Sequence, residues 1–192
     1  PVVDGVRRPN RCLADYVAPK DSKVADYLGC FAVTTGHGVE KKVAEFHAKH
    51  DDYSAIMLQS LADRLAEAFA ELMHHRVRTD LWGYAADEIL TNDQMINEEY
   101  RGIRPAPGYP ACPAHEVKKD LLRVIGSEDI GMTLTESMAM NPASSVSGFY
   151  LAHPDARYFN VGKLSVDQIE DLAKRRNESV EDIRRQLASS ID

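Results

Sequence analysis

Cysteine and long hydrophobic runs are both scarce in this chain. Its 192 residues include three cysteines, Cys12, Cys30 and Cys112, and no C-x-x-C spacing. An odd count without that spacing argues against a disulfide framework and favours a reducing compartment, so we expect a cytoplasmic protein. No apolar run reaches the roughly 18 residues of a membrane span, and no signal-peptide pattern is present. We therefore expect no membrane partner.

An excess of basic residues is also lacking. The formal net charge is −7 and the sequence pI is near 5.5. Binding to a nucleic-acid backbone needs clustered positive charge, so we expect no nucleic-acid partner. Hydrophobic residues make up 44% and charged residues 28%, the balance of a globular chain, and this length favours one compact domain. There is no internal repeat.

The first half of the sequence predicts one strand followed by helices. Residues 26–36 form a β-branched and aromatic run typical of a buried strand, and residues 39–50 have helical periodicity. Residues 51–78 predict the longest helix, with Asp51 or Asp52 as its N-cap. Its large apolar residues recur every three or four positions, so we expect this face to pack on a sheet: Tyr53, Ile56, Met57, Leu61, Leu65, Ala68, Phe69 and Leu72.

The second half alternates between helices and strands. A capping-box pair, Thr91 and Gln94, predicts a short helix over 91–100, and a second helix over 115–126 ends at Gly126. Strand patterns cover 132–137, 145–153 and 157–162, and a turn at 153–156 predicts that the last two form a hairpin. Two helices capped by Ser165 and Ser179 end the chain. This order predicts an α+β fold, a mostly antiparallel twisted sheet with long helices packed on it.

The segment "RPAPGYPACPAH", residues 104–115, contains four prolines and excludes regular helix and central strand. Core-forming elements on both sides argue against a linker. Alternating prolines favour an extended backbone with outward N–H groups, Gly108 permits close approach of a ligand, and Arg104 suits a carboxylate or phosphate. The residues alone leave two interpretations open: a binding segment, or a structural loop whose arginine satisfies local carbonyls.

The stretch "YRGIRPAPGYPACPAH" resembles the S-adenosylmethionine-binding signature of the activation domain of cobalamin-dependent methionine synthases. In that family an arginine and three spacer residues precede Gly-Tyr-Pro-Ala-Cys-Pro, which matches Arg104 to Pro113. Further similar segments occur in the family's order, among them "ADYLGCFAVTTG", "WGYA" and "QIEDLAKRR", and they cover nearly the whole chain. The resemblance implies that residues 1–192 are a single domain, the C-terminal portion of this activation domain.

The resemblance implies a function in repair of the cofactor. Family members reactivate oxidised cobalamin by reductive methylation of cob(II)alamin to methylcobalamin, with S-adenosylmethionine as methyl donor. The implied partners are the cobalamin-binding domain of a parent chain and flavodoxin or a methionine synthase reductase. The chain is thus expected to be part of a methyltransferase of methionine biosynthesis, inactive alone. The alternative is a non-catalytic docking module that contacts the cobalamin domain and a flavodoxin-like reductant.

The resemblance also implies the ligand contacts, with no general acid or base and no metal ligand. Arg104 resembles the arginine that pairs with the ligand carboxylate, and Glu98 resembles an acidic residue near the ligand. The expected contacts with the rest of the ligand are Ala106, Gly108, Tyr109, Tyr158 and Phe159. The last two replace a Tyr-Tyr pair of the family, and strand alternation predicts that they point to opposite faces. Cys112 and His115 are three residues apart, a pattern that suggests a thiol nucleophile or half of a metal site, but the absence of a second Cys/His cluster nearby argues against both.

Overall fold

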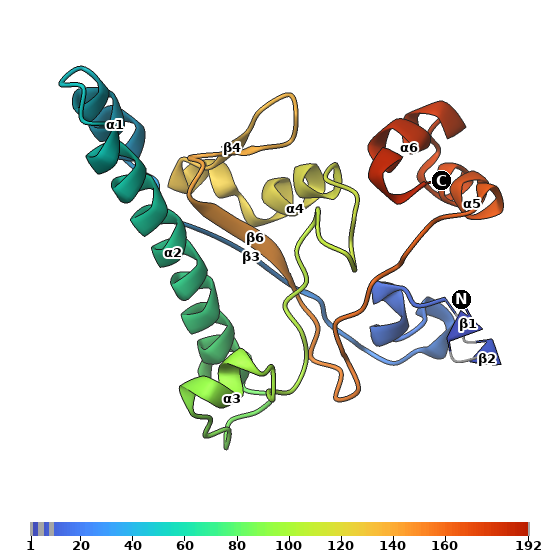
Figure 1. The fold of residues 1–192 in the computed structure, drawn as a ribbon. Helices are drawn as coiled ribbons and strands as arrows, with labels where there is room; N and C mark the ends of the chain where they lie inside the picture. The colour runs from blue at the N-terminus through green and yellow to red at the C-terminus, as the bar shows by residue number, and fades with distance from the viewer. Residues whose placement is uncertain (1, 4–5, 8–9, 192) are drawn as a thin grey trace.

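Two six-residue strands from opposite ends of the chain form the centre of the fold. In this computed structural model, which describes residues 2–3, 6–7 and 10–191, β3 (Gly29–Thr34) pairs antiparallel with β6 (Ser145–Tyr150). Gly29 lies opposite Tyr150, and Thr34 lies opposite Ser145. The helices over 52–76 and 117–125 pack against this two-stranded ribbon, whereas the two C-terminal helices lie apart from it, as Figure 1 shows. The predicted α+β class is confirmed, with antiparallel pairing throughout the named strands of the described residues.

The predicted hairpin over 145–162 is wrong. Residues 157–162 contain no strand, and β6 pairs with β3 instead. The other edge of β6 is also occupied, because Phe149 donates its N–H to the Pro105 carbonyl (2.9 Å) and Ile103 bridges Leu151. Both edges of β6 are therefore used by segments distant in sequence, which leaves no free edge for residues 157–162.

Helix α1 (Val39–His47) and the long helix α2 (Asp52–Arg76) follow β3. Asp51 is the N-cap of α2, accepting a hydrogen bond from the Ser54 N–H at 3.0 Å, and one π-helical turn (Val77–Leu81) extends the helix. The predicted helix is confirmed, but the face that it buries is not the predicted one. The buried side of α2 consists mostly of small residues, of which Ala70 packs on Phe31 and Val33 of the ribbon. We call this side the alanine face: Ala55, Ala62, Ala66 and Ala70.

The large apolar residues of α2 lie in contact with solvent. They form what we call the apolar face, whose members are between 40% and 75% exposed: Tyr53, Ile56, Met57, Leu61, Leu65, Phe69 and Leu72. Where Ala70 meets the ribbon, the side chains opposite are the large Phe31, Val33 and Tyr150, and close packing against them favours a small residue on the helix.

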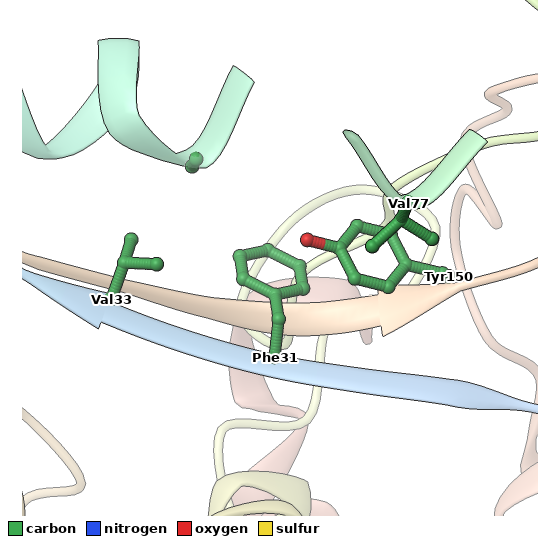
Figure 2. Close-up of a cluster of buried hydrophobic side chains, with 5 residues drawn as sticks. Phe31, Val33, Val77 and Tyr150 are labelled. Atoms are coloured by element: carbon green, nitrogen blue, oxygen red, sulfur yellow. The ribbon is translucent and has the colours of Figure 1, made fainter. Parts of the chain in front are cut away.

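Figure 2 shows this core, in which Phe31 and Val33 project from β3 on the side where Val77 and Tyr150 lie. The rings of Phe31 and Tyr150 are stacked, with centroids 4.7 Å apart. Gly29 is needed beside them, because a Cβ there would lie 2.9 Å from that of Tyr150. The ribbon and α2 thus approach each other through a layer of aromatic rings on one side and methyl groups on the other.

The remaining elements are short. Helix α3 (Asn92–Ile96) has the predicted capping box of Thr91 and Gln94, and α4 (Val117–Ile125) ends at left-handed Gly126 as predicted. Strand β4 (Thr133–Leu134) pairs with β5 (Met140–Asn141), and β1 (Val2–Val3) with β2 (Val6–Arg7). No helix among the described residues is long and apolar enough to cross a membrane.

Two helices end the chain, α5 (Val166–Arg176) and α6 (Val180–Gln186), with Ser165 and Ser179 as N-caps as predicted. Their apolar sides form a cluster around Ile169 and Ile183 that also includes Ala114 of the proline-rich segment and Val117 of α4. Its members are different from those of the core under α2. That residues 1–192 constitute a single domain stays a prediction.

Candidate functional site

A cavity of about 360 Å³ lies where α2, the proline-rich segment and residues 158–159 meet. Six of the seven side chains that the sequence indicates as ligand contacts line it: Glu98, Arg104, Ala106, Tyr109, Tyr158 and Phe159. Phe31 and Val146 of the ribbon line it too, so the cavity borders the hydrophobic core. A larger groove of about 970 Å³ beside α1 contains none of the seven.

The proline-rich segment is less extended than predicted. Three of the backbone donors expected to face outward are used in turns: Gly108 donates to the Cys112 carbonyl (2.7 Å), Cys112 to Tyr109 (2.8 Å), and Tyr109 to Ala106 (3.3 Å). Pro110 accepts a further bond from the Val161 N–H (3.1 Å). The segment therefore does not present the predicted row of free N–H groups, although several of its residues line the cavity.

Gly108 is the predicted contact that does not line the cavity. Its φ is +97°, which favours glycine, and a Cβ there would lie 2.2 Å from Cε1 of His115. The imidazole of His115 thus occupies the space beside Gly108. The structure gives a packing reason for this glycine that does not involve a ligand.

Arg104 is held at both its backbone and its side chain. Its backbone N–H donates to the Tyr158 hydroxyl at 2.9 Å, and its Nη2 donates to Oε2 of Glu71 on α2 at 2.9 Å. The Arg104 side chain is 16% exposed. A partly buried guanidinium that keeps several donors is well suited to a carboxylate ligand.

Tyr158 and Phe159 both line the cavity, contrary to the expectation that they point to opposite faces. That expectation relied on strand alternation, and these residues are not in a strand. The Tyr158 hydroxyl also lies 3.4 Å from that of Tyr100, so Tyr158 connects Arg104 to a buried polar layer.

This polar layer lies below the cavity and contains wholly buried His74 and Arg78. Arg78 donates from Nε and Nη2 to the carboxylate of Glu88 (2.7–2.9 Å), and its guanidinium lies over the Tyr100 ring at 4.3 Å. Burial raises the pKa of Tyr100, and its hydrogen bond with Tyr158 adds to the increase. Tyr100 is therefore protonated at neutral pH and fixed in place.

His74 is packed between two aromatic rings rather than placed at an open helix end. Its ring is stacked on Tyr150 (5.3 Å) and meets Tyr100 edge-on (4.8 Å). Burial, reinforced by the charge of Arg78, lowers the pKa of His74 to about 2. The imidazole is therefore neutral at physiological pH, and it contributes ring packing rather than a positive charge at the end of the helix.

Two acidic side chains line the cavity. Glu98, just beyond α3, has a left-handed backbone with φ of +58°, which is uncommon for a residue other than glycine. Glu67 of α2 also lines the cavity, and the sequence does not single it out. Glu71 lies one turn further along the same helix. The helix is buried through its alanines, and that orientation turns Glu67 toward the cavity.

Cys112 and His115 do not form a reactive pair. Burial raises the pKa of the Cys112 thiol to about 11, so it is protonated at neutral pH, whereas a nucleophilic or metal-binding cysteine needs the thiolate. His115 packs beside Gly108. Among the residues that the structure describes, no three His, Cys, Asp or Glu side chains are grouped to hold a metal ion.

Comparison with known proteins shows the family to which the chain belongs. The chain is similar to a solved structure described as the MetH reactivation domain bound to AdoHcy, with 52% sequence identity and a TM-score of 0.91. The match covers 94% of this chain and 56% of that chain, so this chain spans little more than half the length of its relative. The family model for the activation domain of vitamin B12 dependent methionine synthase matches residues 4–177. The chain therefore belongs to the family of methionine synthase activation domains.

Proposed function

We propose that this chain binds S-adenosylmethionine in the cavity and holds its methyl group for the reductive methylation of cob(II)alamin to methylcobalamin. One observation carries the proposal: six side chains indicated by the family resemblance, from three separate segments, line a single cavity. The similarity to a reactivation domain bound to AdoHcy supports it, because AdoHcy is S-adenosylmethionine without the transferred methyl group.

The charges around the cavity suit such a ligand. The sulfonium is cationic, and Glu67 and Glu98 both line the cavity. The amino-acid carboxylate of the ligand is anionic, and Arg104 offers donors in a planar fork. Tyr109 and Phe159 supply flat surfaces against which adenine can stack. Opposite charges on the protein thus match opposite charges on the ligand.

The residues of this chain contribute position rather than acid–base chemistry. S-adenosylmethionine supplies an already activated methyl group, and cobalamin, which we propose is held by another domain of a parent enzyme, accepts it. The task left for the cavity is to bind the donor and orient its methyl group, a proximity effect. Arg104 fixes one end of the ligand, and the aromatic residues fix the other.

We propose a cytoplasmic methionine synthase as the setting. The cobalamin-binding domain would face this domain during repair, and flavodoxin or a methionine synthase reductase would supply the electron. The net charge of −7 suits a basic surface on such a partner.

Titration calorimetry with S-adenosylmethionine tests the proposal. We expect saturable binding, and we expect Arg104→Ala to weaken it by roughly 1.5–3 kcal/mol, the usual range for hydrogen bonds to charged groups. Arg123→Ala is the control, because it removes an arginine whose ion pair with Asp120 (2.7 Å) is exposed and whose side chain does not line the cavity. A folded chain that gives no heat at millimolar ligand would refute ligand binding and favour the docking-module alternative.

A further inference from the structure

Glu71 contacts Arg104 but does not line the cavity. Its Oε2 accepts from Nη2 of Arg104 at 2.9 Å, whereas Glu67, one turn earlier on the same helix, lines the cavity directly. The second oxygen of Glu71, Oε1, is buried and has no hydrogen-bond partner. Glu71 therefore has no direct contact with the cavity, and its structural link to the cavity is the guanidinium of Arg104.

This ion pair differs from the surface pairs of the molecule. The side chains of Arg104 and Glu71 are 16% and 33% exposed, whereas those of Arg123 and Asp120 are 75% and 78% exposed. Both partners also have fixed backbones, since Glu71 is within α2 and the Arg104 N–H is bound to Tyr158. A long arginine side chain otherwise samples many rotamers, and the contact with Glu71 restricts it before any ligand arrives.

We propose that Glu71 is a positioning residue of the ligand site. It holds the guanidinium of Arg104 with one of its donors, so that the others remain for the carboxylate of the ligand. This inference rests on the proposed function and extends it to a residue outside the cavity. The competing effect is electrostatic, because Glu71 also reduces the positive charge that attracts the carboxylate. Glu71 lies outside the cavity lining, so we expect orientation to be the larger effect.

The test compares two ligands that differ at the end that Arg104 binds. S-adenosylhomocysteine carries the amino-acid carboxylate, and 5′-methylthioadenosine has the same adenosine and thioether but no carboxylate. We expect Glu71→Ala to raise the Kd for S-adenosylhomocysteine roughly tenfold, within the range for coupled neighbours, and to leave the Kd for methylthioadenosine unchanged. In an Arg104→Met background, Glu71→Ala should have no further effect on either ligand.

Two further variants distinguish an effect on ligand binding from a loss of folding. Glu71→Gln keeps the shape and one acceptor, and we expect it to weaken S-adenosylhomocysteine less than Glu71→Ala does. Glu45→Ala removes an exposed glutamate paired with Lys42 (2.8 Å) and should change neither affinity. Thermal melts followed by circular dichroism verify that each variant is folded.

Equal loss of affinity for both ligands in a Glu71 variant would indicate a structural role and overturn the inference. Tighter binding of S-adenosylhomocysteine would mean that Glu71 competes with the ligand for Arg104, which also overturns it. If Glu71 variants bind like the unsubstituted chain, the inference is wrong while the proposed function stands. If the unsubstituted chain binds neither ligand, the proposed function fails, and the inference fails with it.

Discussion

The orientation of α2 leads to a prediction that opposes the hydrophobic pattern of the sequence. Replacing a small buried residue of α2 by a large one should lower the free energy of unfolding more than replacing a large exposed apolar residue by a polar one. Ala70 is 0% exposed and packs in the cluster of Phe31, Val33 and Tyr150, whereas Leu65 is 59% exposed. We therefore expect Ala70→Leu to be destabilising and Leu65→Ser to be nearly neutral.

The magnitudes follow from packing. Extra methylene groups in a close-packed core cost about 1–3 kcal/mol, because neighbouring side chains leave their preferred rotamers. Surface substitutions usually remain within about 0.5 kcal/mol. For a chain of this size, each kcal/mol shifts the melting temperature by roughly 2–4 °C, so a cost of about 2 kcal/mol at Ala70 lowers it by roughly 4–8 °C.

Urea unfolding followed by circular dichroism, with melting temperature as a second measure, compares the two variants. Leu72→Ser, also on the apolar face, serves as a replicate, since it is 55% exposed. The reasoning is refuted if Leu65→Ser destabilises the chain more than Ala70→Leu. That result would mean that the helix buries its large residues, as its sequence pattern predicts.

Two further predictions concern the layer beneath the cavity. The pKa of His74 is about 2 in the folded chain and near 6.5 when unfolded, so the unfolded state takes up the proton first and stability falls as pH decreases below about 6.5. His74→Phe keeps a ring between Tyr100 and Tyr150, and urea unfolding at pH 4 and pH 7 should show a smaller loss of stability on acidification than in the unsubstituted chain. A variant with the same pH dependence would assign the loss to other groups. Tyr158→Phe removes the acceptor of the Arg104 N–H, and calorimetry should show that it weakens ligand binding more than Phe159→Leu does. The reverse order would place the important contact at Phe159.

Local signals in the sequence were sufficient for most elements. The N-caps at Asp51, Thr91 and Ser179 and the glycine stop at Gly126 are determined by residues within a few positions. The α+β class follows from the order of these elements. These features depend on interactions between residues a few positions apart, so they can be predicted from the sequence alone.

The errors concern contacts between distant segments. The pattern of 145–162 resembles a hairpin, but the pairing of β6 is determined by segments more than 40 residues away. Strand β3 pairs along one edge of β6, and Ile103 bridges Leu151 at the end of the other edge. The buried face of α2 depended on the size of ribbon side chains such as Phe31. Periodicity identifies an apolar stripe on a helix, but it does not show whether another segment of the chain packs on that stripe.

The residues of the candidate site also fall into two groups, those that the sequence indicates and those that only the structure reveals. Arg104, Tyr109 and Tyr158 were indicated by family resemblance, and they line the cavity. Glu67 and Glu71 carry no local motif, and only the orientation of α2 brings them to the cavity and to Arg104. Their discovery required the three-dimensional arrangement.

The alanine face of α2 has a consequence for how this site can change in evolution. Two of the four buried alanines immediately precede a glutamate of the site: Ala66 precedes Glu67 and Ala70 precedes Glu71. The distance between α2 and the ribbon therefore determines how far the carboxylates of Glu67 and Glu71 extend toward the cavity. A homologue with a smaller residue in place of Phe31 would need a compensating increase in volume on the helix to keep these carboxylates at the same depth. Side-chain volumes in the hydrophobic layer and the reach of acidic groups in the polar cavity are thus expected to vary together.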